Sequence, residues 1–351
     1  MAAVVQYALE PGAVELREVP VPTEVAEDEV LVATRGVGVC GSDIHQYHNT
    51  QSWRVRVPVI LGHEFTGTLA QVGKSVHGFR EGDRVTSETA AQICGECYYC
   101  HTGEYNLCPK RLGFGYGLDG AMATYVRVPA RCLHHLPESV SFDQAALTEP
   151  CCVAYNATSV KGTIRPGDAV LVLGPGAIGL LCLMMARLNG AGWLGMVGRK
   201  QDAMRLETAG RLGAQRRVIL EEEDVAEVVR KVGDGLGADV VIDASGASIA
   251  LKSAIQAVRP GGQIIKVGWG PQPLDFSIDP LVQKGARIQG CFSHNYAIWE
   301  KVIALMACGG LDLSLLVGRK GPLEEWQACF ESMASGAVIK AVLKPGMTAG
   351  A

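Results

Sequence analysis

The sequence predicts an α/β protein of two domains, one of which is built on a doubly wound parallel sheet. The chain has 351 residues, more than one average domain contains. It is 48% hydrophobic and 19% charged and holds 43 glycines, a composition typical of a well-buried α/β protein. In the middle third, strand-like apolar runs alternate with helix-length segments, and this alternation predicts βαβ units with parallel strands.

A glycine motif opens this middle third. The run Ala169–Leu173 is apolar throughout, as in a parallel strand that is buried on both faces. Gly174, Gly176 and Gly179 then form G-x-G-x-x-G before a helical pattern that continues to about Asn189. Such glycines allow a tight turn and the approach of a pyrophosphate, to which the helix N-terminus donates N–H groups. A glycine turn without a ligand is the alternative, but the strand–turn–helix context favours a Rossmann dinucleotide-binding domain.

The other elements are predicted from apolar periodicity and turn signals. After the motif, strands and helices are expected at Trp193–Val197, Gln201–Leu212, Arg217–Leu220, Asp224–Val232, Ala238–Asp243, Ser248–Val258, Gln263–Val267 and Arg287–Gly290. Before the motif, Val30–Val85 has short valine-rich runs separated by glycine, as in an antiparallel barrel. Beyond the last of these strands, residues 297–308 predict a helix and Val338–Leu343 predicts a strand.

The loop after the second strand bears on the choice of dinucleotide. NAD-binding domains of this type place an acid about 20 residues after the glycines, where it bonds the ribose 2′-OH. In this chain that place is Gly198, followed by Arg199 and Lys200, and no Asp or Glu occurs between Gly179 and Asp202. Two cations suit a 2′-phosphate, and solvated loop charges are the alternative. We therefore expect NADP(H), with NAD(H) as the second choice.

Residues 94–108 carry four cysteines, Cys94, Cys97, Cys100 and Cys108, in the spacing C-x2-C-x2-C-x7-C. Four thiolates can surround one tetrahedral zinc ion, each about 2.3 Å from the metal. A pair of disulfides is the alternative. It is disfavoured because the sequence shows no secretory signal, so we expect a cytoplasmic protein whose thiols stay reduced. Four sulfur ligands leave no position for water, and we predict a closed, structural zinc site.

A second set of metal ligands lies in separate segments. Cys40 offers a thiolate, His63 and Glu64 offer an imidazole and a carboxylate, and Glu149 adds another acid. A catalytic zinc takes about three protein ligands and one exchangeable position. Singly these residues are weak signals, because a buried cysteine is usually a small hydrophobe and Gly-His-Glu is usually a turn. Glu64 can also be a helix-start carboxylate without a metal contact, so the third ligand is either Glu64 or Glu149.

Together these segments resemble the zinc-dependent medium-chain dehydrogenases, in the branch of the alcohol, polyol (sorbitol) and threonine dehydrogenases. The resemblance runs from Met1 to about Pro345. It is carried by Gly-x-Gly-x-Cys-Gly-Ser-Asp-x-His at 36–45, Gly-His-Glu at 62–64, the four cysteines, Glu-Pro at 149–150 and the glycine motif. It implies a GroES-like β-barrel catalytic domain of residues 1–155, completed by 295–351, and a Rossmann domain of residues 156–294. A homo-oligomer, either dimer or tetramer, is also expected.

The resemblance assigns roles to individual residues. A catalytic zinc at Cys40 and His63 lowers the pKa of a substrate hydroxyl, and a hydride passes to the nicotinamide. Ser42 touches the alcohol, and His45 passes its proton to solvent by way of the cofactor ribose. The alignment of the motifs favours Glu149 as the third ligand, with Cys151, two residues further on, as an alternative that faces the zinc. With the closed site, two zinc ions per chain are expected. The residues expected to bind the cofactor are Gly174, Gly176, Ala177, Ile178, Gly179, Gly198, Arg199, Lys200, Val267 and Gly268. No role is predicted for the other histidines, which include His294.

The substrate is the least determined part of the prediction. Threonine dehydrogenases carry a histidine where this chain has Ala91, and sorbitol dehydrogenases carry an arginine where it has Ser293. A pocket rimmed by Ser42, Trp53 and Phe114, beside zinc with a carboxylate ligand, suits a substrate with several hydroxyls. We expect the secondary alcohol of a polyol, cyclitol or sugar derivative. An amino alcohol of the threonine type is the alternative, and a non-catalytic NADP(H)-binding protein is a remote one.

Charge and hydropathy exclude other classes of partner. The net charge of −4 gives no electrostatic reason to expect nucleic acid or an anionic membrane. The apolar run that comes nearest to a membrane span, Ala177–Leu188, is shorter than the roughly 18 residues that a span needs. With these partners excluded, the expected partner is the small-molecule alcohol that the resemblance implies.

Overall fold

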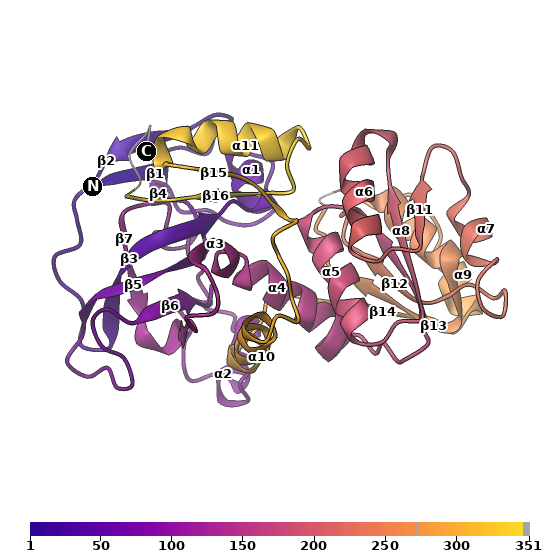
Figure 1. The fold of residues 1–351 in the computed structure, drawn as a ribbon, viewed down its shortest axis with the longest axis horizontal. Helices are drawn as coiled ribbons and strands as arrows, with labels where there is room; N and C mark the ends of the chain where they lie inside the picture. Colours follow the sequence, from indigo (N-terminus) through magenta and orange to yellow (C-terminus); the bar gives the residue numbers. More distant parts are fainter. Residues whose placement is uncertain (271, 347–351) are drawn as a thin grey trace. The chain divides into compact units, whose positions relative to one another are not determined.

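The computed structural model describes residues 1–270 and 272–346 (Figure 1). The chain divides into two compact units. Unit 1 contains Met1–Glu149 and His294–Ala351, and unit 2 contains Pro150–Ser293. The first boundary falls inside a helix, α4 (Thr148–Tyr155), where the sequence suggested a boundary after residue 155.

Unit 1 is built mainly on a seven-stranded sheet in the order β15-β16-β3-β5-β6-β8, with β7 paired to β3. Its strands are β3 (Glu29–Gly38), β5 (Glu64–Val72), β6 (Arg84–Ser87), β7 (Tyr125–Pro129), β8 (Leu133–His135), β15 (Val317–Gly321) and β16 (Lys340–Leu343). A smaller sheet, β2-β1-β4, consists of β1 (Ala2–Gln6), β2 (Val14–Glu18) and β4 (Val59–Ile60). The C-terminal strands, yellow in Figure 1, therefore extend a sheet that the N-terminal half of the chain begins, since Val342 pairs with Gly38.

Two helices of unit 1 are packed together, and their contact holds the segment after β3. The helices of this unit are α1 (Gly41–Tyr47), α2 (Tyr98–His101), α3 (Phe142–Ala145), the first turn of α4, α10 (Tyr296–Ala307) and α11 (Trp326–Ala334). Tyr47 at the end of α1 packs edge-on against Trp326 and Phe330 of α11, with ring centroids 5.6 and 6.1 Å apart. Both α11 residues belong to the apolar core of unit 1, so α1 is fixed to that core.

Unit 2 is a six-stranded parallel sheet in the order β11-β10-β9-β12-β13-β14. Its strands are β9 (Ala169–Leu173), β10 (Trp193–Gly198), β11 (Arg216–Ile219), β12 (Ala238–Asp243), β13 (Val258–Lys266) and β14 (Arg287–Gly290). Its helices are α5 (Ala177–Leu188), α6 (Ala203–Arg211), α7 (Val225–Val229), α8 (Ser248–Ala257) and α9 (Asp279–Gln283), with a π-helical turn at Asn156–Lys161. The predicted doubly wound sheet is confirmed, and its strand order reverses between β9 and β12, where such sheets bind ligands.

The local pattern of the sequence explains the central strand and helix of unit 2. All five residues of β9 are buried, as its apolar run predicts. Gly179 lies in the first turn of α5 against the carbonyl oxygen of Gly174, so any side chain at 179 would clash with that oxygen.

Across the residues that the structure describes, no helix has the length and apolar character that crossing a bilayer requires.

Candidate active site and metal-binding lobe

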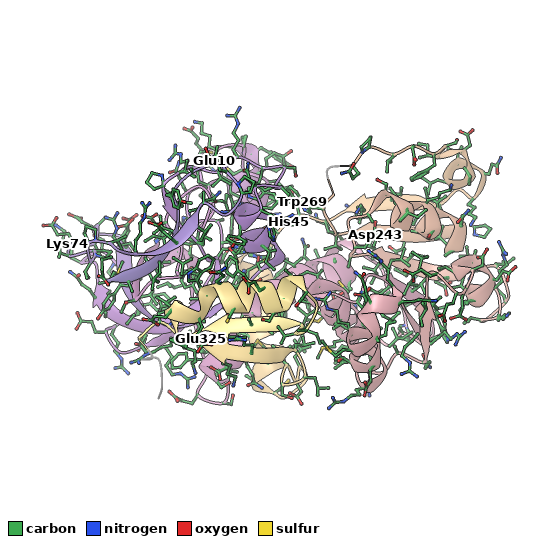
Figure 2. All side chains as sticks on the ribbon, turned by 90° about the horizontal axis from the view of Figure 1, so that it is seen from above. Glu10, His45, Lys74, Asp243, Trp269 and Glu325 are labelled. Atoms are coloured by element: carbon green, nitrogen blue, oxygen red, sulfur yellow. The ribbon has the colours of Figure 1, made fainter. Side chains whose placement is uncertain are left out.

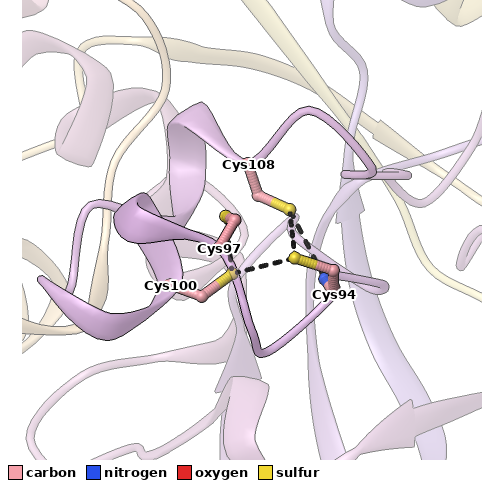
Figure 3. Close-up of side chains that lie close together, drawn as sticks. All are labelled: Cys94, Cys97, Cys100 and Cys108. Carbon is pink, nitrogen blue, oxygen red and sulfur yellow. Dashed lines mark hydrogen bonds between the residues drawn. The ribbon is translucent and has the colours of Figure 1, made fainter.

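The four cysteines of residues 94–108 converge in one lobe of unit 1 (Figure 3). Three pairs of sulfur atoms lie close together: Cys97 and Cys100 at 3.5 Å, Cys94 and Cys108 at 3.6 Å, and Cys94 and Cys100 at 3.8 Å. A disulfide bond is about 2.05 Å long, so these are not disulfides. Four thiolates about 2.3 Å from a central zinc lie about 3.8 Å from one another, so the lobe fits a tetrahedral Cys₄ metal site.

The lobe is hydrogen-bonded to the start of helix α10. Between the third and fourth cysteines, the Gly103 carbonyl accepts a bond from Asn295 Nδ2 (3.2 Å), and the Tyr105 hydroxyl accepts one from the Tyr296 N–H (2.6 Å). The Tyr105 hydroxyl donates in turn to the buried Glu88 carboxylate, with both oxygens 2.8 Å away. The closed lobe therefore fixes the position of α10.

A second group of possible ligands is assembled from the ends of two paired strands. Cys40 follows β3 and caps helix α1, while His63 and Glu64 lie at the start of β5. The strands are in register, with Gly38 opposite Glu64, and a side chain at Gly38 would collide with the Glu64 carboxylate. The possible ligand atoms of Cys40, His63 and Glu64 all lie within 4.8 Å of one another. Glu64 begins a strand, so the alternative of a helix-start carboxylate is wrong.

Two buried charged residues support this group, and neither was predicted. Asp43 Oδ2 accepts the backbone N–H of Cys40 (2.8 Å), and its Oδ1 lies 3.9 Å from His63 Nδ1. Lys340 of β16 forms an ion pair with Glu64 and donates to the Val39 carbonyl (2.6 Å). Asp43 lies inside the motif of residues 36–45 and was open to prediction. Lys340 lies 276 positions from Glu64 in the sequence and gave no local signal.

Glu149 is not among the residues whose possible ligand atoms all lie within 4.8 Å of one another. Its Oε1 is 2.9 Å from His294 Nε2, and both side chains are buried. Burial alone would raise the pKa of Glu149, but the hydrogen bond from His294 holds that pKa below its usual value. His294 was given no role from the sequence, because a lone histidine carries no signal until its partner is known.

Ser42 and His45 both lie on α1. Ser42 Oγ is buried and has no hydrogen-bond partner among the described residues, so it is free to bond a ligand oxygen. His45, labelled in Figure 2, is exposed, and its Nδ1 lies 2.8 Å from Thr50 Oγ1. Partial burial and the nearby His48 lower the pKa of His45, which favours the neutral imidazole. Of the other residues predicted at the pocket rim, Phe114 is a core residue that packs edge-on against Phe65.

The glycine loop of unit 2 has the shape that a dinucleotide phosphate needs. Gly174 has a φ of +97°, and Gly176 caps α5 without a side-chain cap. The first N–H groups of α5, at Ala177 and Ile178, have no acceptor within the helix, and the space beside Gly176 Cα is open. Val267 and Gly268 lie at the same edge of the sheet. Their N–H groups both donate to the carbonyl of Asp243 at 2.9 Å (Asp243 is labelled in Figure 2).

The loop after β10 differs from its prediction in one respect. Arg199 and Lys200 are exposed, but Arg199 Nε lies 3.6 Å from Glu221 and Lys200 Nζ lies 3.2 Å from Glu222. Acids that are absent from this stretch of sequence are therefore supplied by the end of β11. A side chain at Gly198 would contact Pro175 and Leu206, which explains why no acid stands there.

The fold of these two units is that of a dinucleotide-dependent dehydrogenase, and comparisons with known proteins identify the family. The chain matches the models of the alcohol dehydrogenase GroES-like domain over residues 26–138 and of the zinc-binding dehydrogenases over residues 177–308. It is 39% identical to a sorbitol dehydrogenase of Halalkalibacterium halodurans, over 98% of this chain and 99% of the relative. It is 38% identical to a D-arabitol-phosphate dehydrogenase of Enterococcus avium, over 92% and 91%.

A solved structure gives the same result. A protein of the zinc-binding dehydrogenase type from Sinorhizobium meliloti 1021, solved with bound NADP, superposes with a TM-score of 0.90. It is 28% identical, and the match covers 98% of this chain and 99% of that one. The chain belongs to the zinc-dependent medium-chain dehydrogenases and is an oxidoreductase of the alcohol dehydrogenase type.

Proposed function

We propose that this enzyme transfers a hydride between the secondary alcohol of a polyol, cyclitol or sugar derivative and NADP(H), giving the ketone. The observation that carries the proposal is the convergence of Cys40, His63 and Glu64 beside the unpartnered hydroxyl of Ser42. A thiolate, an imidazole and a carboxylate form a donor set typical of catalytic zinc.

The residues of this group have distinct tasks in the proposed reaction. Cys40, His63 and one of the two carboxylates would hold a zinc ion, which when bound acts as a Lewis acid and lowers the pKa of the substrate hydroxyl. Ser42 Oγ bonds the substrate oxygen, and Asp43 fixes the backbone at Cys40 by accepting its N–H at 2.8 Å. His45 accepts the released proton at its imidazole, because its lowered pKa keeps the ring neutral near pH 7.

The four-cysteine lobe would hold a second, structural zinc ion. Its sulfur spacing supports this assignment, because the separations of 3.5 to 3.8 Å match the edges of a tetrahedron of zinc ligands. Reduced thiols of this kind persist in a reducing compartment, so we also propose a cytoplasmic location. A homo-oligomer, dimer or tetramer, remains part of the proposal.

NADP(H) is proposed as the cofactor and NAD(H) as the alternative. Arg199 and Lys200 are exposed cations beside Gly198, and their ion pairs with Glu221 and Glu222 are also exposed. Exposed ion pairs are worth only about 0–1 kcal/mol, so a 2′-phosphate can displace the acids at little cost. The similar structure from Sinorhizobium meliloti contains NADP.

The polyol class is favoured over an amino alcohol by three observations. The two curated relatives described above act, by name, on sorbitol and on a phosphorylated arabitol. A carboxylate in the ligand group gives a more polar site than thiolates alone. The position where threonine dehydrogenases carry a histidine holds Ala91, which is 3% exposed in the core of unit 1.

A substrate panel tests this function. Purified enzyme is assayed with simple alcohols, polyols, cyclitols, polyol phosphates and hydroxy amino acids, each with NADP and NAD, by the absorbance of the reduced nicotinamide. The expected result is oxidation of polyol-type secondary alcohols, faster with NADP. Exclusive turnover of a hydroxy amino acid would establish the alternative, and preference for NAD would overturn the cofactor assignment.

A further inference from the structure

Three buried side chains of unit 1 form a continuous hydrogen-bonded series that ends at Glu149. The indole N–H of Trp299 donates to His294 Nδ1 at 2.7 Å, and His294 Nε2 lies 2.9 Å from Glu149 Oε1. The exposed fractions are 0% for Trp299, 1% for His294 and 8% for Glu149. Solvent therefore does not compete for these bonds.

The chemistry of the indole fixes the direction of both bonds. An indole nitrogen can only donate, so His294 Nδ1 must act as the acceptor. The proton of the neutral ring then lies on Nε2, which donates to the carboxylate. Glu149 Oε1 therefore accepts a bond from a fixed N–H donor, and this bond restrains the orientation of the carboxylate. The charge of Glu149 acts on both His63 and Glu64, so this carboxylate lies near the ligand group.

The surroundings of Trp299 hold its N–H in one direction. Its ring stacks on His134 with centroids 5.3 Å apart and an angle of 7° between the planes. Helix α10, which carries Trp299, is anchored at its first residues to the metal-binding lobe through Tyr105 and Gly103. The indole thus has little freedom to turn away from His294.

We propose that His294 and Trp299 are positioning residues of the active site, which hold Glu149 in a single orientation beside Cys40, His63 and Glu64. This inference rests on the proposed function, because it assumes a metal ion at that group. Trp299 sets the tautomer of His294, and His294 restrains one oxygen of Glu149, so that the carboxylate would meet a bound metal ion in one fixed orientation. Hydrogen bonds of this kind around metal ligands typically change metal affinity or activity by about tenfold to a hundredfold.

The test uses Co²⁺ in place of zinc, because the visible absorption of Co²⁺ reports its ligand geometry without any turnover. The group of Cys40, His63 and Glu64 is called the open site here. The difference spectrum between the wild type and Cys40→Ala gives the absorption of Co²⁺ at the open site without that of Co²⁺ in the four-cysteine lobe. Trp299→Phe keeps an aromatic ring and removes the N–H. Trp326→Phe is the matched control, since Trp326 is also buried in unit 1 but packs on Tyr47 and Phe330. His294→Gln keeps an N–H donor toward Glu149, and His294→Phe removes it.

Trp299→Phe and His294→Phe are expected to shift the spectrum of the open site and to weaken its Co²⁺ affinity by about tenfold or more. His294→Gln is expected to restore much of both, and Trp326→Phe to match the wild type. Wild-type spectrum and affinity in Trp299→Phe would overturn the proposal, and this variant decides it even if His294→Phe fails to fold. If Cys40→Ala has the wild-type spectrum, the open site holds no metal, and it is the proposed function that fails.

Discussion

The two groups of possible zinc ligands in unit 1 are built in opposite ways. The lobe takes all its ligands from one loop of residues 94–108, whose backbone brings the sulfur atoms together. The open group takes Cys40 from the end of β3 and His63 and Glu64 from the start of β5, and β16 and the start of α10 bring the buried partners Lys340 and His294. The ligands of the lobe are thus brought together by one short loop of the chain. The ligands of the open group are brought together only when distant segments pack in the folded protein.

The largest contrast between the two regions is expected when one cysteine of each is replaced. Cys40→Ala should abolish alcohol oxidation and leave NADP(H) binding nearly unchanged, because the glycine loop belongs to the other unit. Cys97→Ser should remove one zinc and lower stability far more than turnover per folded molecule, since structural zinc binding contributes on the order of 10 kcal/mol to folding. Metal analysis, thermal unfolding and steady-state kinetics on both variants measure this. Wild-type turnover in Cys40→Ala would contradict the comparison.

Proton transfer is expected only beside the open group of Cys40, His63 and Glu64, and His45 is the residue expected to accept the proton. The pKa of His45 lies below the ordinary value of 6.5, so its neutral form, which can accept a proton, predominates at pH 7. The oxidation rate of the wild type should fall as the pH drops through this lowered pKa, where the ring becomes charged. His45→Ala should lose about 10²–10⁴-fold near neutral pH and lack this inflection. The control is His48→Ala, which should keep the rate and move the inflection to slightly higher pH. Identical pH profiles for His45→Ala and the wild type would exclude the role.

The buried ion pair between Lys340 and Glu64 tests how far the stability of the open group depends on contacts between distant segments. Lys340→Met leaves the charge of Glu64 buried without its partner, which typically costs about 3–5 kcal/mol. The double variant Glu64→Gln/Lys340→Met removes both charges and should recover much of that loss. Urea unfolding of the two variants measures the difference. If the double variant were no more stable than Lys340→Met, the lysine would act by packing rather than by charge.

The smallest effect on the enzyme is expected for a substitution in unit 2, which contains neither group of possible zinc ligands. Arg199→Ala should raise the KM for NADP(H) by about tenfold to a hundredfold, because charge-assisted hydrogen bonds are worth roughly 1.5–3 kcal/mol. The KM for NAD(H) should change little, since only the 2′-phosphate distinguishes the two cofactors. Glu221→Gln, which removes the competing acid beside Arg199, should instead lower the KM for NADP(H). An equal loss with both cofactors in Arg199→Ala would contradict the assignment.

Features encoded by neighbouring residues could be predicted from the sequence. β9 and β12 have the predicted bounds, because buried parallel strands are marked by continuous apolar runs between turns. β14 also has the predicted bounds, although most of its residues are exposed. The four cysteines converge as their spacing suggests, because a loop of this length can close on a single ion.

Features that depend on distant pairs could not be predicted. Lys340 and Glu64 meet only because β16 pairs with β3, and His294 meets Glu149 across 145 positions of the sequence. No periodicity or spacing carries such information. The acids Glu221 and Glu222 illustrate the same limit, because counting residues along one loop does not show what the next strand brings beside it.

The pairing of β16 with β3 has a consequence for the order in which the protein forms during synthesis. Unit 2 lies within residues 150–293, whereas the sheet of unit 1 lacks β16, and Glu64 lacks Lys340, until about residue 343 has been added. A ribosome adds about 5–20 residues per second, and domains generally fold as units while the chain grows. The inserted unit is therefore complete first, and the group of Cys40, His63 and Glu64 lacks its buried lysine until almost the last strand has been added. A growing chain consequently cannot hold a finished active site before its cofactor-binding unit exists.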